Sequence, residues 1–205
     1  MIGCEIFCQN MPRIGNISRN TEETQIELSL DIDGSGKVEI NTGVGFFDHM
    51  LTLFAKHALV DLTVQAKGDT EVDNHHLVED VGICLGQVLA EALGDKTGIT
   101  RYGMMYLPMD ETLSRVVIDL SNRPYLEFRV PTDKDASVGF PMSLVEEFFR
   151  AVSFNLRCNL HMECLYGRDG HHISESLFKG FARAFRAAAS NDPRQVGVPS
   201  SKGKL

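Results

Sequence analysis

The 205-residue sequence predicts an α+β fold of two similar halves, in which four helices pack between two four-stranded sheets. Two observations support this prediction. The pattern His-His-x-x-Glu occurs at residues 75–79 and again at 171–175, which lie 96 positions apart. Around each copy the same order of segments recurs: three strands, a helix, a strand and a helix. Residues 1–95 and 96–205 are therefore expected to form equivalent half-domains.

The first half-domain begins with strands, because apolar and polar residues alternate cleanly over 26–32. Glycines at 34 and 36 mark a turn, and Gly94 is typical of the end of a helix. The elements expected in chain order are strands at 13–19, 23–33 and 37–41, a helix at 46–58, a strand at 60–67 and a helix at 75–93.

The second half-domain repeats this order, with strands expected at 101–107, 113–120 and 124–130, a helix at 142–155, a strand at 159–166 and a helix at 171–190. Glu147 precedes the second motif by 24 positions and His49 precedes the first by 26, which indicates a short loop insertion. A ferritin-like bundle also carries Glu and His on its helices, but it has no strands between them.

Composition excludes several classes of protein. The hydrophobic fraction of 43% and the charged fraction of 23% are those of an ordinary globular protein. A net charge of −8 argues against a nucleic-acid partner, and the sequence contains no apolar run long enough for a membrane span. Five cysteines without a Cys-x-x-Cys pattern, two of them (Cys84 and Cys158) in apolar segments, indicate a reduced, cytoplasmic protein.

Each His-His-x-x-Glu motif can place its first histidine and its glutamate on one ion, because residues four apart share a helix face. The second histidine diverges by roughly 100°. We call this second residue, His76 or His172, the spare histidine of its motif. Two equivalent metal sites would result if the spare histidine of each copy completed the His/Glu pair of the other copy. Imidazole and carboxylate suit manganese, iron or zinc. A lone surface His-His is usually solvated, but two equivalent copies favour metal binding by His75, His76, Glu79, His171, His172 and Glu175.

Two arginines and the C-terminal tail are candidates for binding an anion. Arg101 and Arg123 lie in turns marked by glycine or proline, and a guanidinium suits phosphate or carboxylate. The tail at 199–203 collects hydroxyls, amides and Lys202, which could cradle a phosphate. Solvated arginines and a disordered terminus are the alternatives.

Seven motifs are spread along the chain, at residues 46–51, 73–80, 92–96, 108–111, 123–125, 171–175 and 199–203, and the match they belong to covers nearly the whole chain. Together they resemble those of the imidazoleglycerol-phosphate dehydratase family. The resemblance implies a lyase of histidine biosynthesis that dehydrates D-erythro-imidazole glycerol phosphate to imidazole acetol phosphate. It also implies two Mn²⁺ ions per active site and a homo-oligomer of 24 subunits, with sites at subunit interfaces.

The same resemblance assigns roles to individual positions. One metal would take His49, His76, His171 and Glu175, and the other His75, Glu79, His172 and residue 147. Many relatives have His at the last position, where this chain has Glu147, either a ligand or a solvated glutamate. The expected catalytic residues are Glu23, His49 and Glu175. Substrate contacts are expected at Glu23, His49, His57, His75, His76, Arg101, Arg123, His171, Ser201 and Lys202, the last two in the substrate-binding tail.

The dehydration explains the need for metals, because the proton to be removed is not adjacent to a carbonyl group. We hypothesise that metals bound to both ring nitrogens favour the imidazolate, and that Glu23 removes the C2 proton. Two alternatives stay open. A dinuclear metallohydrolase would release inorganic phosphate, and a non-catalytic protein held together by metal would have closed sites and no need for Arg101 or Arg123.

Overall fold

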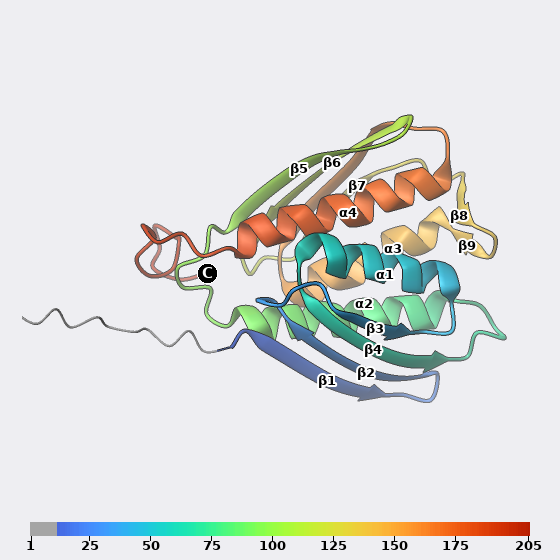
Figure 1. Ribbon diagram of the computed structural model, residues 1–205, viewed down its shortest axis with the longest axis horizontal. Helices are drawn as coiled ribbons and strands as arrows, with labels where there is room; N and C mark the ends of the chain where they lie inside the picture. Colours follow the sequence, from blue (N-terminus) through green and yellow to red (C-terminus); the bar gives the residue numbers. More distant parts are fainter. Residues whose placement is uncertain (1–11) are drawn as a thin grey trace, which may run out of the picture.

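Two four-stranded sheets enclose four helices, and this arrangement confirms the predicted α+β architecture (Figure 1). The computed structural model describes residues 12–205, so Cys4 and Cys8 lie outside the described residues. The first half contains β1 (Ile14–Asn20), β2 (Thr24–Asp31), β3 (Val38–Asn41), α1 (Gly45–Ala58), β4 (Asp61–Gly68) and α2 (His75–Leu93).

The second half contains the same six elements and one small addition. It comprises β5 (Tyr102–Met109), β6 (Thr112–Asp119), β7 (Tyr125–Arg129), β8 (Asp135–Ser137), β9 (Phe140–Pro141), α3 (Met142–Leu156), β10 (Asn159–Tyr166) and α4 (Gly170–Ala189). The short antiparallel pair of β8 and β9 was not predicted. The other boundaries agree with the predicted ones to within a few residues.

Both sheets have the same topology. Their strand orders are β1-β2-β4-β3 and β5-β6-β10-β7, so each strand of one sheet has a counterpart in the other. The third strand of each half runs parallel to the fourth, β3 to β4 and β7 to β10, while the remaining pairs are antiparallel. The repeated pattern inferred from the sequence is therefore present in the fold.

The helices exchange partners between the halves. Helix α2 covers β1 and β2, and α4 covers β5 and β6 in the same way, but α1 packs on α4 and α3 packs on α2. Each half thus completes the helical layer of the other. The shared layer is rich in phenylalanine, with ring centroids 4.8 Å apart for Phe149 and Phe178 and 5.5 Å apart for Phe54 and Phe181.

Each half contains one equivalent close contact between the backbone of a strand and that of a helix. A Cβ atom added to Gly15 would overlap the carbonyl oxygen of Val88, and one added to Gly103 would overlap that of Ala184. The two glycines have equivalent places in β1 and β5, and Val88 and Ala184 each lie 13 residues after the first histidine of their motif. Only glycine allows a helix to approach a strand this closely.

The loop insertion by which the halves were predicted to differ lies in the first half, just before its second helix. Helices α1 and α3 both end in a left-handed residue, Leu59 (φ 59°) and Arg157 (φ 57°), ten residues after His49 and Glu147 respectively. The equivalence of His49 and Glu147 is therefore sound. The loop between β4 and α2 covers 69–74, whereas that between β10 and α4 covers only 167–169.

Cys84 and Cys158 are fully buried, as predicted, and burial raises the pKa of their thiols to about 11 and about 12. Over residues 12–205, none of the helices combines the length and the apolar character that crossing a membrane requires.

Candidate functional site

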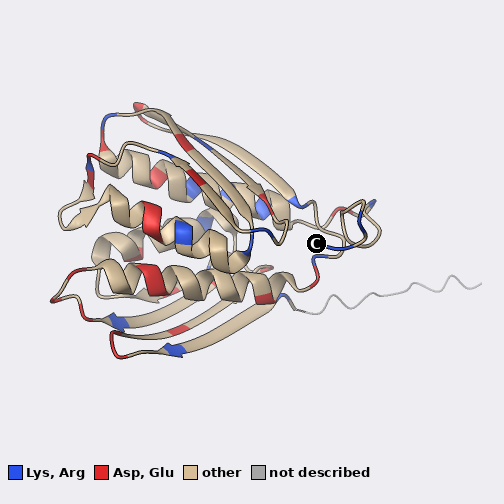
Figure 2. Ribbon diagram, turned by 180° about the vertical axis from the view of Figure 1, so that it is seen from behind, with Lys and Arg blue, Asp and Glu red and all other residues tan. Residues whose placement is uncertain are grey.

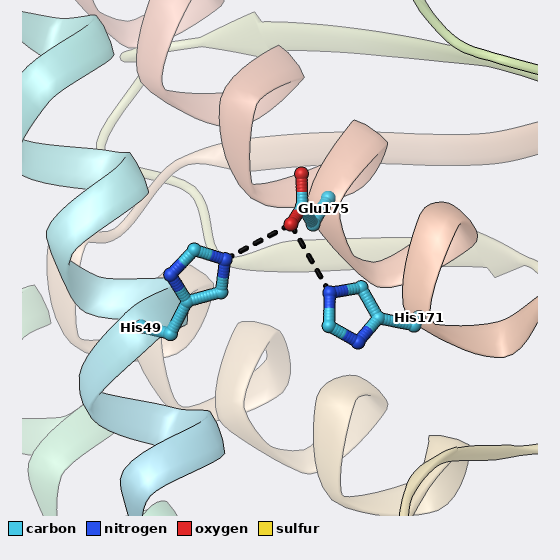
Figure 3. A group of neighbouring side chains, drawn as sticks. All are labelled: His49, His171 and Glu175. Atoms are coloured by element: carbon cyan, nitrogen blue, oxygen red, sulfur yellow. Dashed lines mark hydrogen bonds and ion pairs between the residues drawn. The ribbon is translucent and has the colours of Figure 1, made fainter.

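Three potential metal ligands meet where α1 packs on α4 (Figure 3). The Nε2 atom of His49 lies 2.9 Å from Oε1 of Glu175, and Nε2 of His171 lies 3.1 Å from the same oxygen. One ligand atom of each residue lies within 4.8 Å of the others. Two imidazole nitrogens and one carboxylate oxygen that converge in this way could hold a divalent cation.

The start of α4 positions two of these ligands. The carboxylate of Asp169 accepts hydrogen bonds from the backbone N–H groups of His171 and His172, which caps the helix. His171 and Glu175 then lie one turn apart on the face that meets α1. The ring of Phe46 packs against that of His171 with its centroid 5.3 Å away.

Glu175 is only 7% exposed, and its other carboxylate oxygen accepts a hydrogen bond from Lys179. Burial by itself raises the pKa of this carboxyl. The hydrogen bonds from Lys179, His49 and His171 outweigh that effect and lower its pKa to about 2. Glu175 is therefore ionised at neutral pH, as a ligand must be.

The two histidines of each motif contact different carboxylates, as their divergence around the helix predicts. The ring planes of His75 and His76 make an angle of 88°, and those of His171 and His172 an angle of 87°. Within one chain, however, neither spare histidine completes the pair of the other copy. The chain brings His49 to that position instead.

Carboxylates hold both spare histidines by Nδ1. That of His76 lies 3.0 Å from Oδ2 of Asp69, and that of His172 lies 2.7 Å from Oε2 of Glu111. The hydrogen bond that His76 donates to Asp69 raises the pKa of His76, and the one that His172 donates to Glu111 raises the pKa of His172. Through the same contact the pKa of Glu111 is held well below its usual range.

A further carboxylate faces the remaining nitrogen of each spare histidine. Oε1 of Glu23 lies 3.9 Å from Nε2 of His76, and Oδ2 of Asp110 lies 3.9 Å from Nε2 of His172. The Glu23 side chain is 55% exposed. Glu23 therefore stands beside a predicted ligand with its carboxylate open to solvent.

The second predicted set of ligands is less complete within one chain. His75 Nε2 lies 3.6 Å from Glu79 Oε2, and no third His, Cys, Asp or Glu joins this pair among residues 12–205. Glu147 instead lies 3.7 Å from Nε of Arg150, which also pairs with Glu146. From behind, acidic positions on α2 and α3 and a basic position on α3 face the viewer (Figure 2).

The predicted anion-binding residues line a cavity of about 720 Å³ near the C-terminus. Arg101 is fixed there, because its guanidinium bonds to Asp119 (2.7 Å) and to the carbonyl oxygen of Pro199 (2.8 Å). The tail is thus tied to the body of the protein. The polar and basic residues that line the cavity are Arg101, Ser121, Asn122, Arg123, Arg157, Ser200, Ser201, Lys202 and Lys204.

The C-terminal tail, which lines the basic cavity, and the first turn of α4, which carries His171, lie at opposite ends of α4 (Figure 1). The backbone N–H of Arg101 bonds to the carbonyl of Ala188, whereas His171 lies in the first turn of the same helix. Seventeen residues of helix separate the two places, a length of about 25 Å. His57 lies two turns along α1 from His49, where burial and the charges of Arg183 and Lys179 lower its pKa.

Sequence reasoning missed several residues of these two places. Asp69 follows the turn glycine Gly68, and Glu111 belongs to the motif at 108–111. No spacing or pattern in the neighbouring sequence shows that either carboxylate contacts a histidine. Lys179 has the helical spacing from Glu175 that could have revealed it. Arg157 and Lys204 are isolated basic residues without a sequence signal.

The chain is similar to known proteins over most of its length. The family model of imidazoleglycerol-phosphate dehydratase matches residues 42–185. An imidazoleglycerol-phosphate dehydratase of Akkermansia muciniphila is 61% identical over 196 residues, which cover 94% of this chain and all of the relative.

Two crystal structures of such enzymes have the same fold. That from Staphylococcus aureus has a TM-score of 0.79 at 45% identity, covering 87% of this chain and 99% of the other. That from Pyrococcus furiosus has a TM-score of 0.81 at 40% identity, covering 92% of this chain and all of the other.

Proposed function

The chain belongs to the imidazoleglycerol-phosphate dehydratase family, hydro-lyases of histidine biosynthesis, and from this premise we propose how its residues perform the reaction. The substrate is D-erythro-imidazole glycerol phosphate and the product imidazole acetol phosphate. The histidines and glutamates of two ligand sets would hold two Mn²⁺ ions against the imidazole ring, and the basic cavity would bind the phosphate. The observation that carries this proposal is the convergence of His49, His171 and Glu175 at the α1–α4 contact.

The donor atoms fit divalent metal. Two histidine nitrogens and an ionised, buried carboxylate already meet at one point, which is an arrangement that manganese accepts. His76 would complete this first set of ligands. The second set would be His75, Glu79, Glu147 and His172, and its support is the pairing of His75 with Glu79 and the equivalence of Glu147 to His49.

One active site must combine parts of several subunits. The cluster and the basic cavity of a single chain are about 25 Å apart along α4, much farther than three carbons can span. The phosphate is therefore bound by a different subunit from the one that supplies His171. Exposed Tyr102, Met104 and Tyr106 on the outer face of β5 support contacts between subunits. We propose an assembly of 24 chains with sites at the interfaces.

The metals, when bound, act as Lewis acids that favour the imidazolate form of the ring. Glu23, exposed beside His76, removes the C2 proton as general base. The C2=C3 double bond forms as the C3–O bond breaks, the departing hydroxyl and the removed proton make up the water that is lost, and the resulting enol becomes the ketone. Arg101, Arg123, Ser201 and Lys202 hold the phosphate and thereby fix the distance of the reacting carbons from Glu23. His57 contacts the substrate between these two ends.

The division of the chain at residue 95 stays a prediction. Its support is the identical strand order of the two sheets and the end of α2 at Leu93, just before the boundary.

The test is turnover of imidazole glycerol phosphate by metal-stripped protein, with and without added Mn²⁺. Ketone formation that depends on Mn²⁺ and releases no phosphate is expected. Release of inorganic phosphate would support the metallohydrolase alternative instead, and absence of both products from folded, metal-loaded protein would refute the proposal.

A further inference from the structure

Two equivalent glutamates of the two halves have different surroundings. Glu23 immediately precedes the first residue of β2, and Glu111 immediately precedes the first residue of β6. Each lies eight residues after the glycine that lets its strand approach a helix, Gly15 or Gly103. Glu23 and Glu111 are therefore counterparts, just as His76 and His172 are.

In the second half, the short loop before α4 captures the carboxylate of Glu111. Oε1 accepts hydrogen bonds from the backbone N–H groups of Arg168 (3.1 Å) and Asp169 (3.0 Å), and Oε2 lies 2.7 Å from Nδ1 of His172. The Glu111 side chain is only 25% exposed. Both of its oxygens are engaged, so Glu111 holds the histidine and is less free than Glu23 to meet a substrate.

In the first half, the longer loop before α2 changes this arrangement. The backbone N–H of Asp69 bonds to the carbonyl oxygen of Glu23 (3.1 Å) rather than to its side chain. The loop supplies its own carboxylate, that of Asp69, to Nδ1 of His76. The side chain of Glu23 accepts no hydrogen bond from residues 12–205, and it faces Nε2 of His76 from 3.9 Å.

We propose that Asp69 and Glu111 are positioning residues, each of which fixes its histidine by Nδ1 so that Nε2 faces a metal, and that Asp69 thereby frees Glu23 for substrate. A carboxylate that accepts the Nδ1–H fixes the tautomer and the ring orientation of a metal-binding histidine. The inference rests on the proposed function, because it assumes that His76 and His172 bind the two metals.

The test is titration of the metal-stripped assembly with Mn²⁺, followed by electron paramagnetic resonance, in the wild type and three variants. Asp69→Asn and Glu111→Gln should each weaken one of the two classes of Mn²⁺ site by about 10–100-fold, and a different class in each case. Glu23→Gln alters the counterpart of Glu111 and is the matched control. It should keep both Mn²⁺ affinities within about twofold of the wild type, while turnover falls at saturating metal and substrate.

Circular dichroism and the mass of the assembly report whether each variant folds. Since Glu111 also accepts two loop amides, Asp69→Asn keeps the test decisive if Glu111→Gln does not fold. Wild-type affinities in a folded Asp69→Asn variant would overturn the inference and leave the proposed function intact. So would a Glu23→Gln variant that loses as much Mn²⁺ affinity as Glu111→Gln. A wild type that binds no Mn²⁺ would refute the proposed function itself, and the inference with it.

Discussion

The separation of the metal-ligand cluster from the basic cavity predicts complementation between two inactive variants. One chain carries His171→Ala and lacks the cluster. The other carries Arg123→Ala and Lys202→Ala and lacks two of the basic side chains that are proposed to bind the phosphate. Arg123 is a mild site to change, because its closest carboxylate oxygen, on Asp119, is 3.6 Å away. Each variant alone should be nearly inactive.

Mixed assemblies should recover activity because, in the proposed assembly, each active site takes its cluster and its cavity from different subunits. With equal amounts of both chains and random assembly, half of the sites receive an intact cluster, and half of those also receive an intact cavity. The recovered turnover should therefore be about one quarter of the wild type. If a single chain supplied both parts, the recovery would be zero.

The assay is co-expression of the two chains with different affinity tags, purification over both tags and measurement of Mn²⁺-dependent ketone formation. The control is a mixture of His171→Ala with Glu175→Gln, which damages the same part in both chains and should recover nothing. Doubly tagged assemblies of the first pair that remain inactive would refute the argument from the length of α4.

Three further predictions concern single positions. Glu147→Ala should weaken one class of Mn²⁺ site by about tenfold or more, whereas Glu146→Ala, which alters another partner of Arg150, should leave both classes unchanged in the same titration. The substitution Gly103→Ala should lower the free energy of unfolding by about 1–3 kcal/mol, because the added Cβ overlaps the backbone of α4. Gly45→Ala, whose added Cβ has nothing within 4 Å, should not destabilise the protein. Denaturant titrations of both variants measure the difference. Lys96 is 2% exposed and donates a hydrogen bond of 2.6 Å to Oδ1 of Asn122, in the loop beside Arg123. The substitution Lys96→Ala should therefore raise KM and lower the free energy of unfolding by about 1–3 kcal/mol. An unchanged KM would mean that this loop does not position the phosphate.

Features encoded by local spacing could be predicted from the sequence. The bounds of α2 were predicted to the residue, because a histidine motif opens the helix and Gly94 follows its end. The alternation in β2 gave its buried face, Ile26, Leu28 and Leu30. The pairing of His171 with Glu175 follows from helical geometry alone.

Features that depend on tertiary packing could not be predicted in this way. The meeting of His49 with Glu175 requires α1 to pack on the second helix of the other half, which no local pattern shows. The strands β8 and β9 have only three and two residues, which is too short for a strand pattern to identify them. The contact of Asp69 with His76 depends on the path of an irregular loop.

The joining of two equivalent halves in one chain has a consequence for how the site can vary. In a dimer of identical half-chains, every substitution would appear in both copies of the site at once. A tandem chain removes this constraint, so a histidine can occupy one copy of a position (His49) and a glutamate the other (Glu147). The same freedom lets one loop lengthen while its counterpart stays short. Covalent linkage thus allows a symmetric architecture to carry an asymmetric reaction, in which one side of the substrate must lose a proton and the other a hydroxyl group.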